Sequence, residues 1–189
     1  MTSITILSDT HLPKRARALP TVLWSAIDRS DLVVHAGDWV HAPLLDELER
    51  RASRLVAVWG NNDPNELRAR LPEIARFELG GLRWAVTHET GPAGGRERRM
   101  DGAFPRGGSP ETASPGTDVL IFGHSHIPWD SVSPGGLRLL NPGSPTDRRR
   151  QPHGTFMTAT VDAGVLSDVV VHEIPSAGQS QAGHASVVV

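Results

Sequence analysis

ITILSDTH, at residues 4–11, contains the pattern from which the fold of the whole chain can be inferred. Positions 4–7 are mostly apolar and β-branched, as in a buried strand, and Asp9 and His11 follow at once. The pattern of a short apolar run followed by polar residues recurs further along the chain. It appears at residues 32–34, 55–58, 84–86 and 119–122. The sequence therefore predicts five strands, each ending in a polar cluster.

The segments between these strands indicate how the strands are connected. Residues 20–29 and 43–51 have helical patterns with proline near the first turn, so the first half predicts parallel βαβ units and a layered α/β fold. In the second half, residues 137–140, 155–161 and 165–174 are strand-like and are separated by Gly, Pro and Asn instead of helices. We expect these three strands to pair antiparallel.

The length of 189 residues favours a single domain, to which we assign residues 1–175. Residues 91–117 are rich in glycine and proline, and we expect a long mobile loop there with one short helix near residues 96–103. Residues 176–189 are rich in Ser, Gly, Ala and Gln, a composition typical of a disordered tail.

Composition excludes several classes of protein. A net charge of −2 argues against stable nucleic-acid binding, and the absence of cysteine restricts any metal site to nitrogen and oxygen ligands. The first residues contain neither a basic n-region nor a long apolar h-region, and no stretch reaches the roughly 18 apolar residues of a membrane span. We therefore expect a cytoplasmic protein that does not contact a membrane and acts on a small-molecule substrate. The sequence leaves open whether the protein forms a homo-oligomer.

The polar clusters are informative because ligands bind at the carboxyl ends of strands in α/β sheets, where these clusters would meet. Each cluster alone also has a structural explanation, as a turn or a helix cap. Together, Asp, His and Asn are ligands suited to divalent metals, and neighbouring glycines allow the backbone to turn sharply. The clusters contain Asp9, His11, Asp38, Asn61, Asn62, Asp63, His88, His124 and His126.

Six stretches match, in order, the motifs of a known family. They are Ser8-Asp9-Thr10-His11, His35-Ala36-Gly37-Asp38, Gly60-Asn61-Asn62-Asp63, Thr87-His88, Gly123-His124-Ser125-His126 and Asn141-Pro142-Gly143-Ser144. The chain thus resembles the calcineurin-like metallophosphoesterases, and among them the small bacterial and archaeal phosphodiesterase branch. This resemblance covers residues 8 to about 145 and implies a layered β-sandwich of mixed sheets flanked by helices.

The resemblance also implies a centre of two metal ions. It places Asp9, His11, Asp38 and His126 around the first ion, and Asp38, Asn61, His88 and His124 around the second, with Asp38 as the bridge. Two such ions neutralise an anionic ester and lower the pKa of a bridging water, whose hydroxide hydrolyses the phosphate ester. We expect phosphodiester substrates and Mn²⁺ as the ion, with iron, zinc or nickel as alternatives.

Two positions depart from the family pattern. Asn62 stands where many members have a histidine that stabilises the phosphate or protonates the leaving group, and an amide cannot act as a general acid. We therefore expect slow, broad activity, with Asn62 and Asp63 as the candidate catalytic residues of this loop. Glu89 stands where glycine is frequent; it either faces solvent or lies near the site, where its carboxylate would repel the substrate or orient a ligand.

Other residues are candidates for supporting roles. His35 is expected to pack or hydrogen-bond beneath the site, Asn141 to lie in a tight turn beside it, and Arg148 either to meet substrate phosphate or to face solvent. By sequence adjacency, Trp39 and Trp129 are hypothesised to stack on a base or an aryl leaving group.

Alternative functions are a phosphomonoesterase, a protein phosphatase, and a non-catalytic scaffold. The last arises because the family resembled includes a retromer subunit that uses this fold for protein contacts. All seven metal-ligand positions hold competent residues in this chain, which argues against the scaffold.

Overall fold

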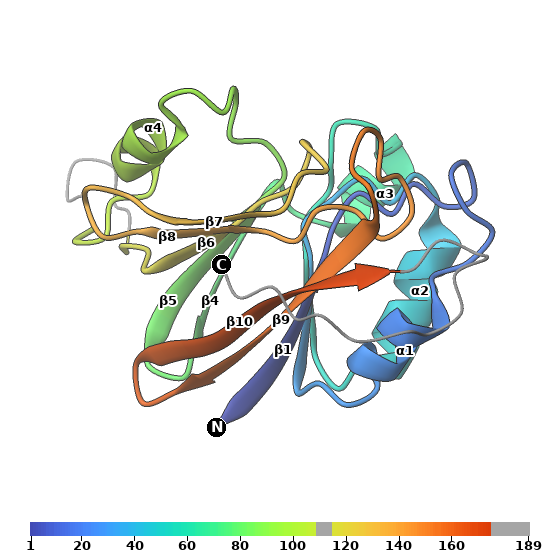
Figure 1. Ribbon diagram of the computed structural model, residues 1–189, viewed down its shortest axis with the longest axis horizontal. Coiled ribbons are helices and arrows are strands. Elements are labelled where there is room, and N and C mark those ends of the chain that lie inside the picture. The colour runs from blue at the N-terminus through green and yellow to red at the C-terminus, as the bar shows by residue number, and fades with distance from the viewer. Residues whose placement is uncertain (109–114, 175–189) are drawn as a thin grey trace.

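The computed structural model describes residues 1–108 and 115–174, and these form two five-stranded sheets (Figure 1). The expected tail at 176–189, and residues 109–114 of the expected loop, lie outside the described residues. No helix within the described ranges is long and apolar enough to cross a bilayer.

The first sheet has the strand order β10-β9-β1-β2-β3. Its strands are β1 (Thr2–Leu7), β2 (Leu32–His35), β3 (Leu55–Ala57), β9 (Gly154–Asp162) and β10 (Val165–Ile174). β1, β2 and β3 are parallel and connected through α1 (Thr21–Ile27) and α2 (Ala42–Arg51), which confirms the predicted βαβ units. β9 pairs antiparallel with both β1 and β10, as expected.

The second sheet has the strand order β4-β5-β6-β8-β7. Its strands are β4 (Ile74–Leu79), β5 (Leu82–Thr87), β6 (Val119–Ile121), β7 (Trp129–Val132) and β8 (Arg138–Asn141). The prediction for 137–140 was partly wrong, because β8 pairs parallel with β6 and antiparallel only with β7. α4 (Arg96–Ala103) lies within the expected loop region, where a short helix was predicted.

Sequence reasoning missed β4, β7 and α3 (Asn65–Arg70). β4 and β7 are edge strands, and β4 alternates between exposed and half-buried residues instead of forming a continuous apolar run. α3 has six residues and buries only Leu67, so it has no helical apolar stripe to recognise.

The core forms three layers of side chains between four layers of backbone. Ile4 and Ile6 of the first sheet pack against Trp84 and Val86 of the second. On the outer faces, α1 and α2 pack against the first sheet, and Met100 of α4 packs against the second (Figure 1). The sandwich is therefore flanked by helices on both sides, and its parallel strands are buried on both faces.

Candidate metal centre

The seven predicted metal ligands lie together where the parallel strands of both sheets end. Asp9, His11, Asp38 and Asn61 follow β1, β2 and β3, whereas His88, His124 and His126 follow β5 and β6. The loops of the two sheets are in direct contact here, because the backbone N–H of His124 donates to Asp9 Oδ2 at 3.0 Å. The His88 ring also contacts the Ala36 carbonyl, 2.7 Å from Nδ1.

One group of ligand atoms consists of Asp9, His11 and His126. The two histidine Nε2 atoms are 3.2 Å apart, and His126 Nε2 lies 3.2 Å from Asp9 Oδ1. Ser8 Oγ donates to the other oxygen of Asp9 at 2.7 Å. Asp9 Oδ1 is fully buried and has no hydrogen-bond donor, which leaves this oxygen available to a cation.

The second group lies beside Asp38, whose Oδ2 is 3.4 Å from His88 Nε2 and 3.5 Å from His11 Nε2. Asn61 Oδ1 extends this group, since it lies 3.1 Å from His88 Nε2 and 3.0 Å from His124 Nδ1. Ligand atoms of Asp9, Asp38 and His88 also lie within 4.8 Å of one another, close enough to share a metal ion. One oxygen of Asp38 thus lies between histidines of both groups.

Five of the seven ligands have a left-handed backbone. The φ angles are 55° at Asp9, 43° at His11, 61° at Asp38, 70° at His124 and 59° at His126. Each such residue costs about 1–3 kcal/mol and persists only where its surroundings enforce it. Gly37 also has positive φ, and a Cβ there would lie 2.8 Å from His88 Nδ1. The strain is concentrated where side chains must turn towards one centre.

Backbone carbonyls orient two of the histidines. His126 Nδ1 lies 2.5 Å from the Asp147 carbonyl, and His88 Nδ1 makes its contact with Ala36. A carbonyl can only accept, so in each ring Nδ1 carries the proton and, in the neutral ring, Nε2 has the lone pair that binds a metal.

Protonation equilibria reflect the packing of acid and imidazole groups. Burial, the largest single cause, disfavours charge on His88, but the hydrogen bond to Asp38, the negative charges of Asp9 and Asp38 and the Ala36 carbonyl together outweigh it and raise the His88 pKa to about 9. Burial likewise opposes the charge of Asp38, yet the contacts with His88 and Asn62 lower the pKa of Asp38. The pKa of His126 is raised by Asp9 against burial, whereas burial lowers the pKa of His11.

These residues fit divalent metal ions. The donors are carboxylate, amide and imidazole atoms, a set that suits Mn²⁺, iron and zinc. Their convergence leaves Asp9 Oδ1 without a donor, and it brings three histidine Nε2 atoms towards two carboxylates.

Asn62 and Asp63, the candidate catalytic residues, differ in their surroundings. Asn62 is exposed and donates to Asp38 twice, from its backbone N–H at 2.8 Å and from Nδ2 at 2.6 Å. Asp63 is buried, and its carboxylate accepts backbone N–H groups of Asp38, Val40 and Gly60. Burial raises the Asp63 pKa despite these bonds. Asp63 thus holds two loops together, whereas Asn62 lies at the surface of the site.

Two predicted supporting residues lie beneath the ligand loops. His35 is fully buried, with Nε2 at 3.1 Å from Thr10 Oγ1, and burial lowers its pKa well below the usual value. Asn141 is buried too, and its Nδ2 donates to the Gly123 carbonyl at 2.9 Å. Both side chains thus contact ligand loops, His35 that of Thr10 and Asn141 that of Gly123.

The stacking hypothesis for Trp39 was wrong. Trp39 is completely buried, with its ring 3.5 Å from that of His35, and its indole donates to the Val58 carbonyl. An aromatic ring packed in the core cannot stack on a substrate. Trp129 is half-buried and the Arg96 guanidinium covers one face of its ring at 4.5 Å, so that face is closed to a substrate.

Arg148 lies on the surface, where its guanidinium donates to the Gln151 carbonyl of its own loop at 2.6 Å. Sequence reasoning did not single out Asp147 and Arg15. Asp147 contacts His126 through its carbonyl, and its carboxylate lies 3.1 Å from Arg15 Nε. No motif marks these residues, because only the fold brings the two loops together.

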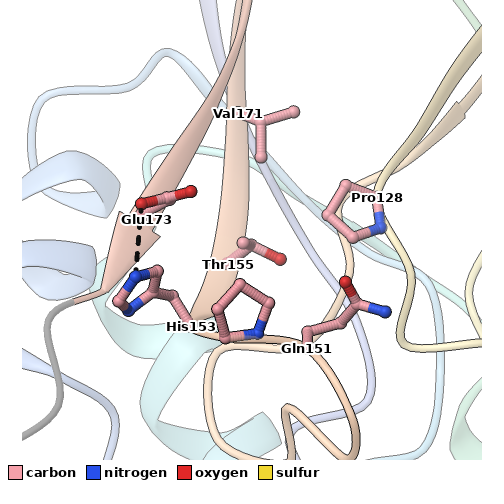
Figure 2. A pocket seen from close by; sticks show the side chains of 7 residues that line it. Pro128, Gln151, His153, Thr155, Val171 and Glu173 are labelled. Atoms are coloured by element: carbon pink, nitrogen blue, oxygen red, sulfur yellow. Dashed lines mark ion pairs between the residues drawn. The ribbon is translucent and has the colours of Figure 1, made fainter. Parts of the chain in front are cut away.

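A separate pocket of about 180 Å³ lies at the ends of β9 and β10 (Figure 2). Its lining consists of Pro128, Gln151, Pro152, His153, Thr155, Val171 and Glu173, and includes none of the seven ligand residues. His153 Nε2 and Glu173 Oε2 are 3.7 Å apart at its edge. The rest of the lining is mostly apolar, which does not suit a phosphate group.

The sandwich and its ligand cluster define a metal-binding α/β protein whose site joins two sheets. Residues 2–164 match the calcineurin-like phosphoesterase superfamily domain. A probable metallophosphoesterase of Methanocaldococcus jannaschii is 35% identical over 148 residues, covering 76% of this chain and 68% of the relative. A phosphodiesterase of the same organism is 25% identical over 154 residues, covering 74% and 82%.

Among solved structures, Vps29 of Chaetomium thermophilum superposes with a TM-score of 0.77 at 18% identity, covering 98% of this chain and 96% of Vps29. This likeness concerns the fold alone. The family match extends over most of the chain. The chain therefore belongs to the calcineurin-like phosphoesterase superfamily, a family of phosphoester hydrolases that bind divalent metal ions.

Proposed function

We propose that this protein hydrolyses phosphodiesters with two divalent metal ions held by Asp9, His11, Asp38, Asn61, His88, His124 and His126. The observation that carries the proposal is the junction at Asp38, where one carboxylate oxygen lies between His11 and His88. When bound, two ions in such a site neutralise the phosphate, lower the pKa of a water and clamp the attacking and leaving oxygens in line. Mn²⁺ is the ion we expect.

The chain's own residues position the ligands and the substrate. Asn62 donates twice to Asp38 and so orients the bridging carboxylate. Asp63 fixes the loop of Asp38 to that of Gly60. Because Asn62 has no proton to give up at neutral pH, the chain supplies no general acid there, and good leaving groups should react fastest.

The preference for diesters rests on charge and on a relative. A monoester dianion carries more charge than a diester monoanion, and the exposed Glu89 carboxylate lies 3.9 Å from His124 Nδ1, on the side of the second group. The phosphodiesterase of M. jannaschii is in accord with this preference.

The test is hydrolysis of a panel of diesters and monoesters by protein reconstituted with Mn²⁺, with Asp38→Asn as the matched variant. We expect diester turnover that disappears with a chelator and falls by at least about 10²-fold in Asp38→Asn, as when a group acting in the transition state is lost. Equal turnover by the two proteins would refute the two-metal mechanism. Faster monoester than diester hydrolysis would instead favour a phosphomonoesterase.

A further inference from the structure

The edge of the metal centre beside His126 is formed by the segment that follows β8. Ser144 Oγ donates to the Asp9 carbonyl at 2.7 Å, and Thr146 Oγ1 donates to the Thr10 carbonyl at 2.6 Å. These bonds fix the segment against the first ligand loop. The backbone of this segment is therefore held in place beside the first ligand group.

Asp147 connects this segment to the metal centre and to two arginines. Its carbonyl contacts His126 Nδ1, and its Oδ2 lies 3.1 Å from Arg15 Nε and 3.9 Å from Arg149 Nε. The Asp147 side chain is 13% exposed, whereas Arg15 and Arg149 are 62% and 54% exposed. We name Arg15, Asp147 and Arg149 the basic rim.

The basic rim has an excess of positive charge next to a phosphoester site. One carboxylate cannot neutralise two guanidinium groups, and Lys14, Arg148 and Arg150 are exposed next to them in sequence. The whole chain has a net charge of −2, so this local charge is not a general property of the surface. Guanidinium groups bind phosphate through bidentate hydrogen bonds. The single carboxylate of Asp147 leaves some N–H donors of the two arginines for a phosphate group.

The second ligand group has an acidic side chain beside it instead. Glu89 Oε1 lies 3.9 Å from His124 Nδ1, and the Glu89 side chain is exposed. The surface around the metal centre is thus positively charged beside the first ligand group and negatively charged beside the second. A substrate with an anionic substituent on one side only would be oriented by this difference.

We propose that the basic rim binds a second phosphate group of the substrate, so that diesters with an additional terminal phosphate are preferred over diesters without one. This proposal rests on the proposed function of the same site. The basic rim recognises charge, and Trp39, the aromatic residue next to Asp38, is buried and cannot stack on a base. Arg15 and Arg149 act as specificity residues and take no part in bond breaking.

The first experiment compares dithymidylate with and without a 5′-phosphate as substrates of the Mn²⁺-loaded protein. We expect kcat/KM to be about tenfold or more higher with the 5′-phosphate, the range of one or two charge-assisted hydrogen bonds. In the double variant Arg15→Gln/Arg149→Gln, this ratio should fall close to one while dithymidylate itself is still hydrolysed.

The matched control is Arg29→Gln. Arg29 is exposed and lies at the opposite end of β1, where its carbonyl contacts Ser3. Like the single variant Arg15→Gln, with which it is compared, it removes one positive charge from the surface, but without touching the basic rim, so its ratio should stay that of the wild type. A ratio that falls equally in Arg29→Gln would mean that net charge acts at long range, and it would overturn the proposal.

A second experiment needs no turnover and separates the two proposals. Calorimetric titration measures the affinity of a dithymidine with an uncleavable methylphosphonate linkage, with and without the 5′-phosphate. Tighter binding of the phosphorylated form that is lost in the double variant supports the basic rim, even if no diester is hydrolysed and the proposed function fails. Equal affinities, or a preference that persists in the double variant, overturn the basic rim and leave the proposed function intact.

Discussion

His11 Nε2 and His126 Nε2 lie 3.2 Å apart although the two residues follow strands of different sheets. Their rings are stacked, with 5.1 Å between centroids and 25° between planes. The Asp147 carbonyl accepts the Nδ1 proton of His126, so Nε2 of the neutral His126 ring has a lone pair. The two Nε2 atoms can therefore lie this close only around a shared proton or cation. The first ligand group therefore joins the two sheets.

The first prediction follows from this contact. His126→Ala should bind Mn²⁺ in the first group at least about tenfold more weakly, because it removes a ligand and the contact with Asp9. Calorimetric titration should give two ions for the wild type and one tightly bound ion for the variant. His153→Ala is the control, since His153 belongs to the separate pocket. An unchanged stoichiometry in His126→Ala would contradict the assignment.

The second prediction concerns pH and the metal-free protein. The pKa of His88 rises from its ordinary value of 6.5 to about 9 in the fold, so the charged ring paired with Asp38 stabilises the fold fully below pH 6.5. That contribution is lost as the pH rises from 6.5 to about 9. In the presence of a chelator, the Tm should therefore decline over this interval.

The same proton has the opposite effect when metal is present. A metal ion must displace it from His88, so Mn²⁺ affinity should increase with pH up to about 9. His88→Gln has no such proton and should make the decline of the Tm between pH 6.5 and 9 smaller, with the remainder coming from His126, whose pKa is also raised. A wild-type Tm in chelator that stays constant across this interval would show that His88 is neutral in the fold.

The third prediction addresses the missing acid at Asn62. Asn62→His introduces a proton donor at the surface of the site but loses the amide bond to Asp38 at 2.6 Å. The kcat for alkyl diesters should rise relative to that for aryl diesters, by about 10-fold to 10²-fold, because only poor leaving groups need protonation. Asn62→Ala, which loses the same bond without adding an acid, is the control. An identical alkyl-to-aryl ratio in the two variants would exclude the general-acid explanation.

The fourth prediction separates Asp63 from catalysis. Asp63→Asn replaces an acceptor oxygen with a donor facing backbone N–H groups, so it should reduce the free energy of unfolding by about 1–3 kcal/mol. Urea denaturation in chelator measures this, with the exposed Glu66→Gln as the control. Loss of turnover without loss of stability would instead assign Asp63 a direct catalytic role.

Much of this fold could be predicted because its parallel strands are buried on both faces. Such strands appear as continuous apolar runs, as at Leu32 to Val34, and the residues that follow them lie at one end of the sheet. β4 could not be recognised, since an edge strand with one solvent face has no such run. The parallel pairing of β8 with β6 also has no local signal, because a strand's partner depends on the whole sheet.

The residues of the candidate site also differ in whether they could be predicted from the sequence. Its ligands have chemically distinctive side chains next to strand ends, which made Asp9 or His88 visible in the sequence. Residues that act through position were not visible. Trp39 is adjacent to Asp38 in sequence, yet its side chain points into the core, and Arg15 reaches the site only because its loop meets Asp147.

The last prediction concerns Glu89, whose carboxylate lies 3.9 Å from His124 Nδ1 at the exposed edge of the second group. A negative charge there repels a dianionic monoester more than a monoanionic diester, because the interaction scales with the substrate's charge. Glu89→Gln keeps the size of the side chain and removes the charge. It should raise kcat/KM for 4-nitrophenyl phosphate by several-fold more than for bis(4-nitrophenyl) phosphate. Salt should diminish the difference, since the group is exposed and screened.

Glu97→Gln, a change on α4 where Glu97 contacts Ser131, is the control for lost charge elsewhere. Equal effects of Glu89→Gln on both substrates would show that Glu89 orients His124 and does not select by charge.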